Sequence, residues 1–300
     1  MQAYLKLIKF DNLILIALAQ LFIKYGLFEP FDIDITLNAF GISLLIVSTI
    51  SLVAAANIML HIQNKEYAII EETSEAVISE KIMNRLFIIF NVIGVAIGFY
   101  LSNIIGKPKL AALFIVVSGV FYIYTTYLKE ILVLKNILIG VLMALGLIGV
   151  TIFDLLPAIT EQNRVSQKVI FLIVVDYSIF AFIIVTIREI LKDCIHIDRD
   201  HNAGLPTIPI TLGKERTTKL ISGLTLIPIG LIIYYVYTYL FNNSIAVVIV
   251  LGLLVAPLLY FMFKSWGAEN NKEFKTLSLI LKIVLFIASL SLLLYQFILK

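Results

Sequence analysis

The sequence predicts an all-α integral membrane protein, and three observations lead to that prediction. Hydrophobic residues make up 61% of the 300 residues, charged residues make up only 14%, and the mean hydropathy is +1.02. A soluble globular domain has an apolar share of about one half. The apolar residues also gather in runs of the roughly 20 residues that an α-helix needs to cross a bilayer. These values exclude a soluble globular domain.

Nine such runs follow one another along the chain. They leave no stretch long enough for a soluble domain, since the longest gaps are the loops at 61–83 and 190–217. We therefore expect a single membrane domain over residues 1–300. The nine expected spans lie at 11–29, 37–60, 84–104, 110–128, 136–154, 169–189, 218–239, 244–263 and 276–297.

Lysine and arginine are distributed unevenly between the loops. If the N-terminus faces the cytoplasm, 16 of the 23 basic residues lie on that side, together with both long loops. Because short loops rich in Lys and Arg stay in the cytoplasm, we expect a multi-pass protein of the cell membrane whose two long loops are cytoplasmic. The formal net charge of +3 gives no reason to expect a nucleic-acid partner.

The second long loop holds a dense cluster of acidic and basic side chains. From residue 188 to residue 213 the chain reads R-E-I-L-K-D-C-I-H-I-D-R-D-H-N-A-G-L-P-T-I-P-I-T-L-G. If the preceding helix continues through this stretch, Asp193, His196 and Asp200 are spaced i, i+3 and i+7 and share one face. The pattern then brings metal-capable side chains together at the mouth of a membrane protein.

Two further aspartates fall in or beside the expected spans. Asp176 lies near the middle of the sixth span, where a carboxylate is costly enough to be a functional candidate. A hydrogen-bonded structural aspartate facing another helix explains Asp176 equally well. We interpret Asp154, at the end of the fifth span, as an interfacial residue.

The second loop resembles the second aspartate-rich loop of the UbiA-type intramembrane prenyltransferases. The family pattern there runs approximately R-E-I-x-K-D-I-E-D-x-E-G-D-x-x-A-G-x-x-T-L-P-V-x-x-G. His196 takes the place of the middle aspartate. The residues that stand at the family's positions are Arg188, Glu189, Lys192, Asp193, Asp200, Ala203, Gly204, Thr207, Pro209 and Gly213.

Two other segments carry the same resemblance. Residues 124–129 and Asn136 resemble the family's Y-S-x-x-L-K-R and the following G-N, although Glu130 replaces the arginine and Lys135 replaces the glycine. Residues 11–20 resemble the family's first helix. Together with the span count, the resemblance covers nearly the whole chain, and its wording is closest to the geranylgeranylglycerol-phosphate geranylgeranyltransferase branch.

The resemblance implies nine transmembrane helices around an apolar pocket that opens at the cytoplasmic side. In the family, aspartates of both loops hold Mg²⁺ ions that neutralise the diphosphate of an allylic prenyl donor as its C–O bond breaks. The resemblance therefore implies Mg²⁺ as the cofactor and Asp193 and Asp200 as catalytic metal ligands. The implied partners are a prenyl diphosphate, a hydrophobic acceptor and membrane lipid.

Basic and polar residues near the two loops gain roles through the same resemblance. Lys192 and Lys129 are the expected catalytic lysines, as direct contacts of the diphosphate. Arg188 is a further contact, because the planar fork of a guanidinium suits phosphate oxygens. The expected substrate-binding residues are Asn57, His61, Lys65, Tyr124, Arg188 and His196.

The first loop departs from the family pattern N-D-x-x-D-x-x-x-D. Alignment on Asn57 places Ile58, His61 and Lys65 at the three aspartate positions. One metal then lacks a protein ligand, and we expect either weakened metal binding or a different metal, because imidazole suits transition metals better than Mg²⁺. We therefore expect a weak or inactive catalyst that still holds a prenyl diphosphate, with Lys65 as a direct contact.

The predicted activity is prenyl transfer from a polyprenyl diphosphate to a lipid or aromatic acceptor. A first alternative is a non-catalytic homologue that binds a prenyl lipid or a partner protein, which the altered first loop would explain. A second alternative is a transporter, which needs polar residues along a path through several spans, and Asp176 alone supports it only thinly.

Overall fold

The computed structural model of the protein describes residues 2–67, 78–127 and 131–294, and the side chains of residues 63–67 are not among the described features. The chain divides into two compact units. The first unit consists of Met1–Lys129 and Gly146–Val174, and the second unit consists of Glu130–Leu145 and Val175–Lys300. The chain passes between the units inside two helices, α6 (Leu134–Val150) and α7 (Arg164–Ile195). The prediction of a single domain over residues 1–300 stays a prediction.

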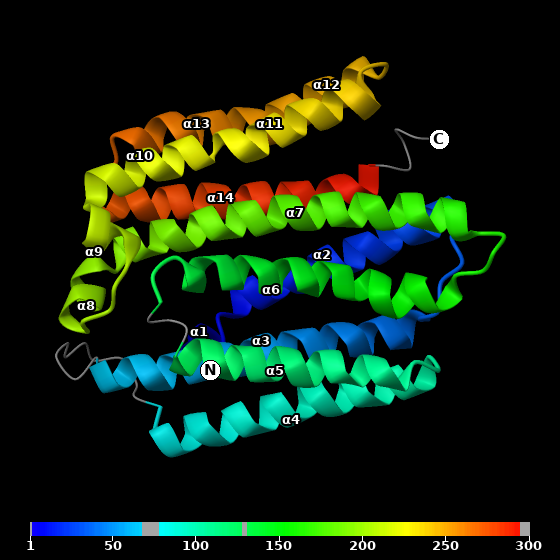
Figure 1. Cartoon of the computed structure of the whole chain (residues 1–300), viewed down its shortest axis with the longest axis horizontal. Coiled ribbons are helices and arrows are strands. Elements are labelled where there is room, and N and C mark those ends of the chain that lie inside the picture. Colours follow the sequence, from blue (N-terminus) through cyan, green and yellow to red (C-terminus); the bar gives the residue numbers. More distant parts are fainter. Residues whose placement is uncertain (1, 68–77, 128–130, 295–300) are drawn as a thin grey trace. The chain divides into compact units, whose positions relative to one another are not determined.

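Helices account for all of the regular secondary structure among the described residues (Figure 1). Before α6 they are α1 (Gln2–Leu7), α2 (Phe10–Phe22), η1 (Ile23–Phe28), η2 (Glu29–Phe31), α3 (Ala39–Tyr67), α4 (Glu80–Ile104), η3 (Pro108–Leu110) and α5 (Ala111–Thr126). Between α6 and α7 lie η5 (Thr151–Leu155) and η6 (Leu156–Ala158). After α7 come α8 (Ile197–Asn202), α9 (Ile208–Leu212), α10 (Lys214–Leu224), α11 (Leu226–Tyr235), η7 (Val236–Leu240), α12 (Ser244–Val250), η8 (Leu251–Val255), α13 (Ala256–Trp266), α14 (Asn271–Ser291) and η9 (Leu292–Leu294).

Nine segments of the described chain are helical, long and apolar enough to cross a membrane. Each of them overlaps one of the nine predicted spans, so the predicted all-α membrane fold is confirmed. The segments are Phe10–Phe31, Ala39–Ile62, Glu80–Ile104, Pro108–Thr126, Leu134–Ala158, Arg164–Ile195, Lys214–Leu240, Ser244–Trp266 and Asn271–Leu294.

In the first unit, small residues let α3, α4 and α5 pack closely (Figure 1). A Cβ atom added at Gly98 would lie only 2.2 Å from the Phe114 ring of α5. At Gly94 it would lie 2.7 Å from Leu52 of α3, where Ser48 Oγ also donates a hydrogen bond to the Gly94 carbonyl at 2.6 Å. Close backbone approach through small residues is how helices associate in membranes, where no hydrophobic driving force acts between them.

The interpretation of Asp154 as an interfacial residue is wrong, because its side chain is fully buried in the first unit. Lys24 of η1 donates a hydrogen bond to Asp154 Oδ2 at 2.8 Å, and neither side chain is more than 1% exposed. Asp154 Oδ1 accepts from the backbone N–H groups of Leu37 at 2.7 Å and Thr36 at 3.1 Å. Buried charges of this kind persist only when they are paired and hydrogen-bonded. The pair therefore ties the segment before α3 to the ends of the first and fifth spans.

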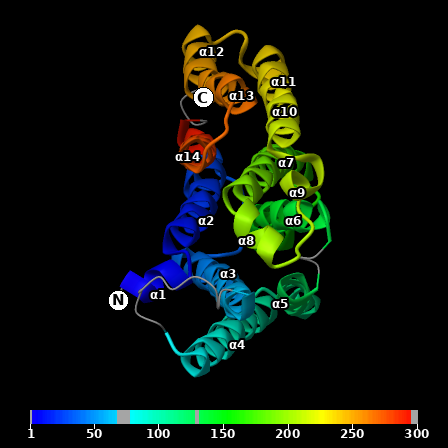
Figure 2. The same cartoon turned by 90° about the vertical axis from the view of Figure 1, so that its left-hand side faces the viewer.

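In the second unit, α7 and α14 are joined by hydrogen bonds at two levels. The hydroxyls of Tyr177 and Ser291 lie 2.7 Å apart, and further along both helices Arg188 Nε donates to Ser278 Oγ at 3.2 Å. Figure 1 shows α8 and α9 beyond the C-terminal end of α7, and Figure 2, in which this end faces the viewer, shows them on the near side. The acidic loop therefore lies at one end of these helices.

Candidate active site

The helix that carries the second motif ends before the motif does. Helix α7 stops at Ile195, His196 leaves the helical conformation at φ −105°, and α8 begins at Ile197. The continuous helix predicted for this stretch is therefore interrupted at His196. Gly204 follows α8 with φ 65°, a left-handed conformation that glycine adopts without steric cost.

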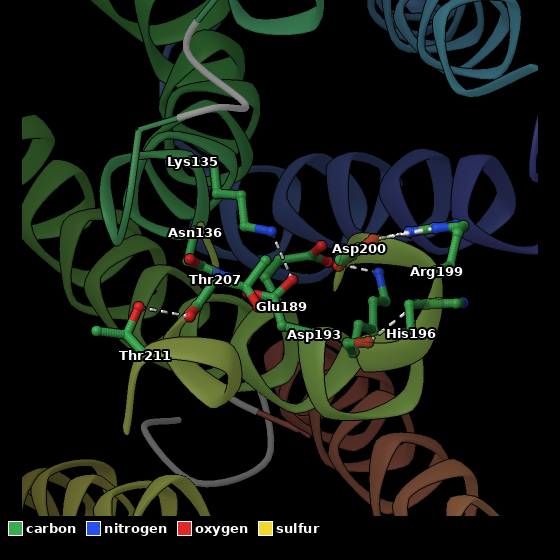
Figure 3. Close-up of polar contacts among 10 residues, drawn as sticks. Lys135, Asn136, Glu189, Asp193, His196, Arg199, Asp200, Thr207 and Thr211 are labelled. Atoms are coloured by element: carbon green, nitrogen blue, oxygen red, sulfur yellow. Dashed lines mark hydrogen bonds and ion pairs between the residues drawn. The ribbon is translucent and has the colours of Figure 1, made fainter. Parts of the chain in front are cut away.

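Asp193 is the centre of a cluster of polar side chains in the second unit (Figure 3). It is buried near the end of α7, and Lys135 Nζ lies 2.8 Å from its Oδ1. Asn136 Nδ2 donates to the other carboxylate oxygen at 2.9 Å. Both partners come from the start of α6, so the turn into that helix positions two donors on one carboxylate.

Asp200 supplies a second buried carboxylate from α8. Arg199 donates to Asp200 Oδ1 through Nε at 3.0 Å and through Nη2 at 2.8 Å. The Asp200 carboxylate is close enough to Asp193 to interact with it electrostatically. The structure therefore gathers Asp193 and Asp200 in one neighbourhood, although their use as metal ligands stays a prediction.

Two polar atoms of the cluster are buried and have no hydrogen-bond partner among the described residues. They are Asn136 Oδ1 and Thr207 Oγ1. Thr207 stands at the position that precedes α9, where a threonine hydroxyl commonly caps the helix, yet it makes no such bond. Figure 3 shows Thr207 on the same side of the cluster as Asn136. A buried polar group without a partner costs free energy, so these two atoms are available to a polar ligand.

Among the described residues His196 makes no side-chain hydrogen bond to either aspartate, although Asp200 is close enough to interact with it electrostatically. It is exposed, and its ring Nδ1 lies 2.9 Å from the Lys192 carbonyl oxygen, at the edge of the cluster in Figure 3. Partial burial of the ring, and then the nearby Arg199 guanidinium, lower the pKa of His196 from its ordinary value. Both effects favour the neutral imidazole, and its Nδ1 lies at the Lys192 carbonyl rather than at a carboxylate.

The donors of the cluster have the chemistry that Mg²⁺ prefers, which is oxygen. Within the described part of the chain, no three His, Cys, Asp or Glu side chains are grouped so that they could hold a metal ion. Mg²⁺ does not need such a group, because it commonly binds one or two carboxylates and completes its shell with substrate phosphates and water. Asp193, Asp200 and the free Asn136 Oδ1 therefore fit an ion that arrives together with a diphosphate.

The other predicted site residues of the second unit lie on α7. Lys192 pairs with Glu189 one turn earlier. Arg188 donates hydrogen bonds to Ser278 of α14, which fixes its guanidinium by backbone and hydroxyl oxygens. The roles of Lys192 and Arg188 toward a diphosphate stay predictions.

The remaining predicted residues belong to the first unit. Asn57 Nδ2 donates to the Ile8 carbonyl at 3.1 Å, His61 is exposed and Tyr124 is buried. Lys129 and the side chain of Lys65 lie outside the described residues. The structure therefore gives only the local surroundings of these first-unit residues, and their contact with substrate stays a prediction.

Sequence reasoning gave no role to Lys135 and Thr207. Lys135 was visible only as a departure from a glycine in the family pattern, and its partner Asp193 lies 58 residues away. Thr207 matches the family pattern, but the sequence does not show that its hydroxyl lacks a partner. The departure at position 135 was the only sign in the sequence of the lysine that pairs with Asp193.

Comparison with known proteins agrees with this architecture. The sequence model of the UbiA prenyltransferase family matches residues 14–295. The chain belongs to the UbiA prenyltransferase family. No curated protein sequence matches the chain at a significant level. Membership confirms the resemblance seen in the second loop and makes the protein a multi-pass member of a family of prenyltransferases.

Solved structures of UbiA homologues share the fold over nearly the whole chain. A digeranylgeranylglyceryl phosphate synthase superposes with a TM-score of 0.63 at 16% identity, covering 97% of this chain and 98% of its own. A UbiA homologue from Archaeoglobus fulgidus bound to GPP and Mg²⁺ gives 0.64 at 15% identity, with 97% and 99% covered. The apo UbiA homologue from Aeropyrum pernix K1 gives 0.67 at 14% identity, with 96% and 98% covered. At these identities the likeness establishes the fold.

Proposed function

We propose that the protein transfers a prenyl group from a polyprenyl diphosphate to a lipid or aromatic acceptor, at the cluster around Asp193. The observation that supports this most is the pairing of two buried carboxylates with two buried polar atoms that lack partners. Homologues of the same fold have been solved with GPP or DMAPP together with Mg²⁺. The cluster offers the same kinds of group to a diphosphate: carboxylates for a metal, cations and a hydroxyl.

Each side chain of the cluster has a distinct task in this proposal. Asp193 and Asp200 would hold Mg²⁺, whose charge offsets that of the diphosphate when the ion is bound. Thr207 donates its free hydroxyl to a phosphate oxygen, and Asn136 keeps Asp193 oriented through its amide. The C–O bond between the prenyl group and the diphosphate breaks, and the diphosphate leaves with the bonding electrons. The acceptor bonds to the prenyl carbon and releases its proton to the departing diphosphate or to water.

Lys135 compensates in part for the altered first loop. The aspartates that the family carries there are replaced by Ile58, His61 and Lys65, so the charge that a metal at that loop would supply is missing. Lys135 stands where the family has glycine, and its ammonium group lies 2.8 Å from Asp193. We infer that Lys135 supplies a fixed positive charge to the leaving diphosphate, as preorganised electrostatics does in other active sites.

Purified protein in lipid nanodiscs, incubated with radiolabelled geranylgeranyl diphosphate, tests the proposal. We expect labelled lipid products that require Mg²⁺, and we expect Asp193→Asn or Asp200→Asn to lower the rate on the order of 10²-fold or more. Asp198→Asn is the matched control, because Asp198 is exposed and lies on the same short helix as Asp200. Full activity of the Asp193 and Asp200 variants would contradict the assigned site.

A non-catalytic role is the second candidate, and the loss of carboxylates from the first loop favours it. In that case the protein binds a prenyl diphosphate without consuming it. Equilibrium dialysis with labelled geranylgeranyl thiodiphosphate separates the two functions: Mg²⁺-dependent binding without any labelled product from the diphosphate supports the non-catalytic role.

A further inference from the structure

The second unit contains a pocket of about 480 Å³ that is separate from the candidate active site. Its walls come from α7, α11, η7, α12, η8 and α14. Asp176 lines it and lies 17 residues before Asp193 on α7, which is about 26 Å at the helical rise of 1.5 Å per residue. Figure 1 shows α12, which forms one wall, at the opposite end of α7 and α14 from α8.

The pocket has apolar walls and a few polar groups. Most of its lining consists of aliphatic and tyrosine side chains. The polar groups include the Asp176 carboxyl, the Tyr177 and Ser291 hydroxyls, which lie 2.7 Å apart, and Asn243, whose side chain caps α12. Three further tyrosines of the lining also carry hydroxyls: Tyr234, Tyr235 and Tyr239. An apolar pocket of this size with a few convergent polar groups is typical of small-molecule sites, which measure about 300–1,000 Å³.

Asp176 is the polar group whose position needs an explanation. Among the described residues it has no hydrogen-bond or ion-pair partner, although it lies near the middle of a membrane span. A carboxyl group at that depth is costly unless something satisfies it. The other polar groups of the lining are uncharged, and bringing a cation to that depth is itself costly, so the pocket suits a ligand that exchanges hydrogen bonds with Asp176.

We propose that this pocket binds a neutral single-chain lipid alcohol, with its hydroxyl on Asp176 and its hydrocarbon tail along the apolar walls. A hydroxyl both donates and accepts, so it satisfies a carboxyl group in either direction. The walls formed by η7, α12 and η8 face the tail with aliphatic side chains. The site does not depend on prenyl transfer, because the pocket and the Asp193 cluster occupy different ends of the second unit.

Photolabelling of the purified protein in nanodiscs tests the proposal, with diazirine-labelled hexadecanol as the probe. We expect saturable labelling of peptides from 231–254 and 287–294, displaced by unlabelled hexadecanol but not by hexadecylamine. Asp176→Leu removes the hydrogen-bonding group and should weaken labelling about tenfold, the effect of about 1.4 kcal/mol in affinity. Asp176→Asn keeps a hydrogen-bonding group and should retain most of the labelling.

Two tryptophan variants on α12 separate the pocket from the general lipid surface. Ile249 lines the pocket and is partly exposed, so Ile249→Trp fills the space without replacing a buried core residue and should also abolish saturable labelling. Val248→Trp is its matched control, because Val248 is on the same helix, is exposed and does not line the pocket. Equal labelling of both variants, labelling that never saturates, or displacement by hexadecylamine alone together with its loss in Asp176→Asn would overturn the proposal.

Discussion

Two lysine–aspartate pairs of this protein have the same 2.8 Å separation and different surroundings. Lys24 and Asp154 are sealed in the first unit, with side-chain exposures of 1% and 0%. Lys135 and Asp193, in the second unit, keep exposures of 12% and 10%. The two pairs therefore have the same N–O separation and differ in their exposure to solvent.

The polar groups around each ion pair show how solvent exposure relates to ligand binding. Both carboxylate oxygens of Asp154 are bonded within the protein, to Lys24 and to backbone N–H groups. Both oxygens of Asp193 are bonded as well, to Lys135 and Asn136, so the difference lies in the polar groups around each pair. Beside Asp193, Asn136 Oδ1 and Thr207 Oγ1 are buried and have no hydrogen-bond partner in the part of the chain that the structure describes. A saturated buried pair stabilises one structure, whereas an unsaturated neighbourhood has free groups for a substrate.

Removing the cation of the fully buried Lys24–Asp154 pair should have the largest effect on stability. Lys24→Met leaves the Asp154 carboxylate buried without its cation, and we expect the free energy of unfolding to fall by about 3–5 kcal/mol. The midpoint of thermal unfolding in detergent measures this. Lys219→Met is the control, because Lys219 forms an exposed pair with Glu215 at 2.7 Å and exposed pairs contribute little. An unchanged midpoint for Lys24→Met would remove the distinction between the two pairs.

The partly exposed Lys135–Asp193 pair should instead affect the reaction rate. Lys135→Met removes the fixed charge beside Asp193, and we expect the rate with geranylgeranyl diphosphate to fall on the order of 10²-fold. We expect the midpoint of thermal unfolding to change less than in Lys24→Met, because water reaches this site. A faster Lys135→Met enzyme would show that the lysine hinders metal binding at Asp193.

Restoring carboxylates in the first loop tests whether the altered residues there limit the rate. Restoring carboxylates with His61→Asp and Lys65→Asp together should raise kcat about tenfold, or about 1.4 kcal/mol in activation free energy, by returning metal ligands to the first loop. Ile58 is not a suitable third site, because it is fully buried among Leu7, Ile62 and Met83. An activity that falls after the double substitution would show that His61 or Lys65 already serves the reaction.

The variants that test membrane topology should change activity and stability the least. In a Cys194→Ala background, Asn202→Cys places an exposed thiol beside the Asp193 cluster, and Glu161→Cys places one in the loop before α7. If the acidic loop is cytoplasmic, an impermeant maleimide should label Cys at position 161 in intact cells and at position 202 only after the cells are opened. The reverse pattern would invert the predicted orientation.

The prediction of the fold from the sequence succeeded because span formation is a local property. A run of about 20 apolar residues has the length of a membrane-spanning helix, and a helix satisfies all its backbone hydrogen bonds within the segment. Each of the nine predicted spans overlaps a helical segment of the described residues, and the second loop was recognised from its own residues. The altered residues of the first loop were also visible in sequence, although their consequence for activity stays a prediction.

What the tertiary structure alone decided is which polar groups meet. Asp154 looked interfacial because its neighbours in sequence do not reveal Lys24, which is 130 residues away. The pairing of Asp193 with a lysine is not visible in the sequence, because Lys135 is 58 residues away. The sequence placed His196 on the same helical face as Asp193, because the two residues are spaced i and i+3. Hydropathy is summed along the chain and can be read from it, whereas electrostatic pairing depends on distances of a few ångströms that only the packing of separate helices sets.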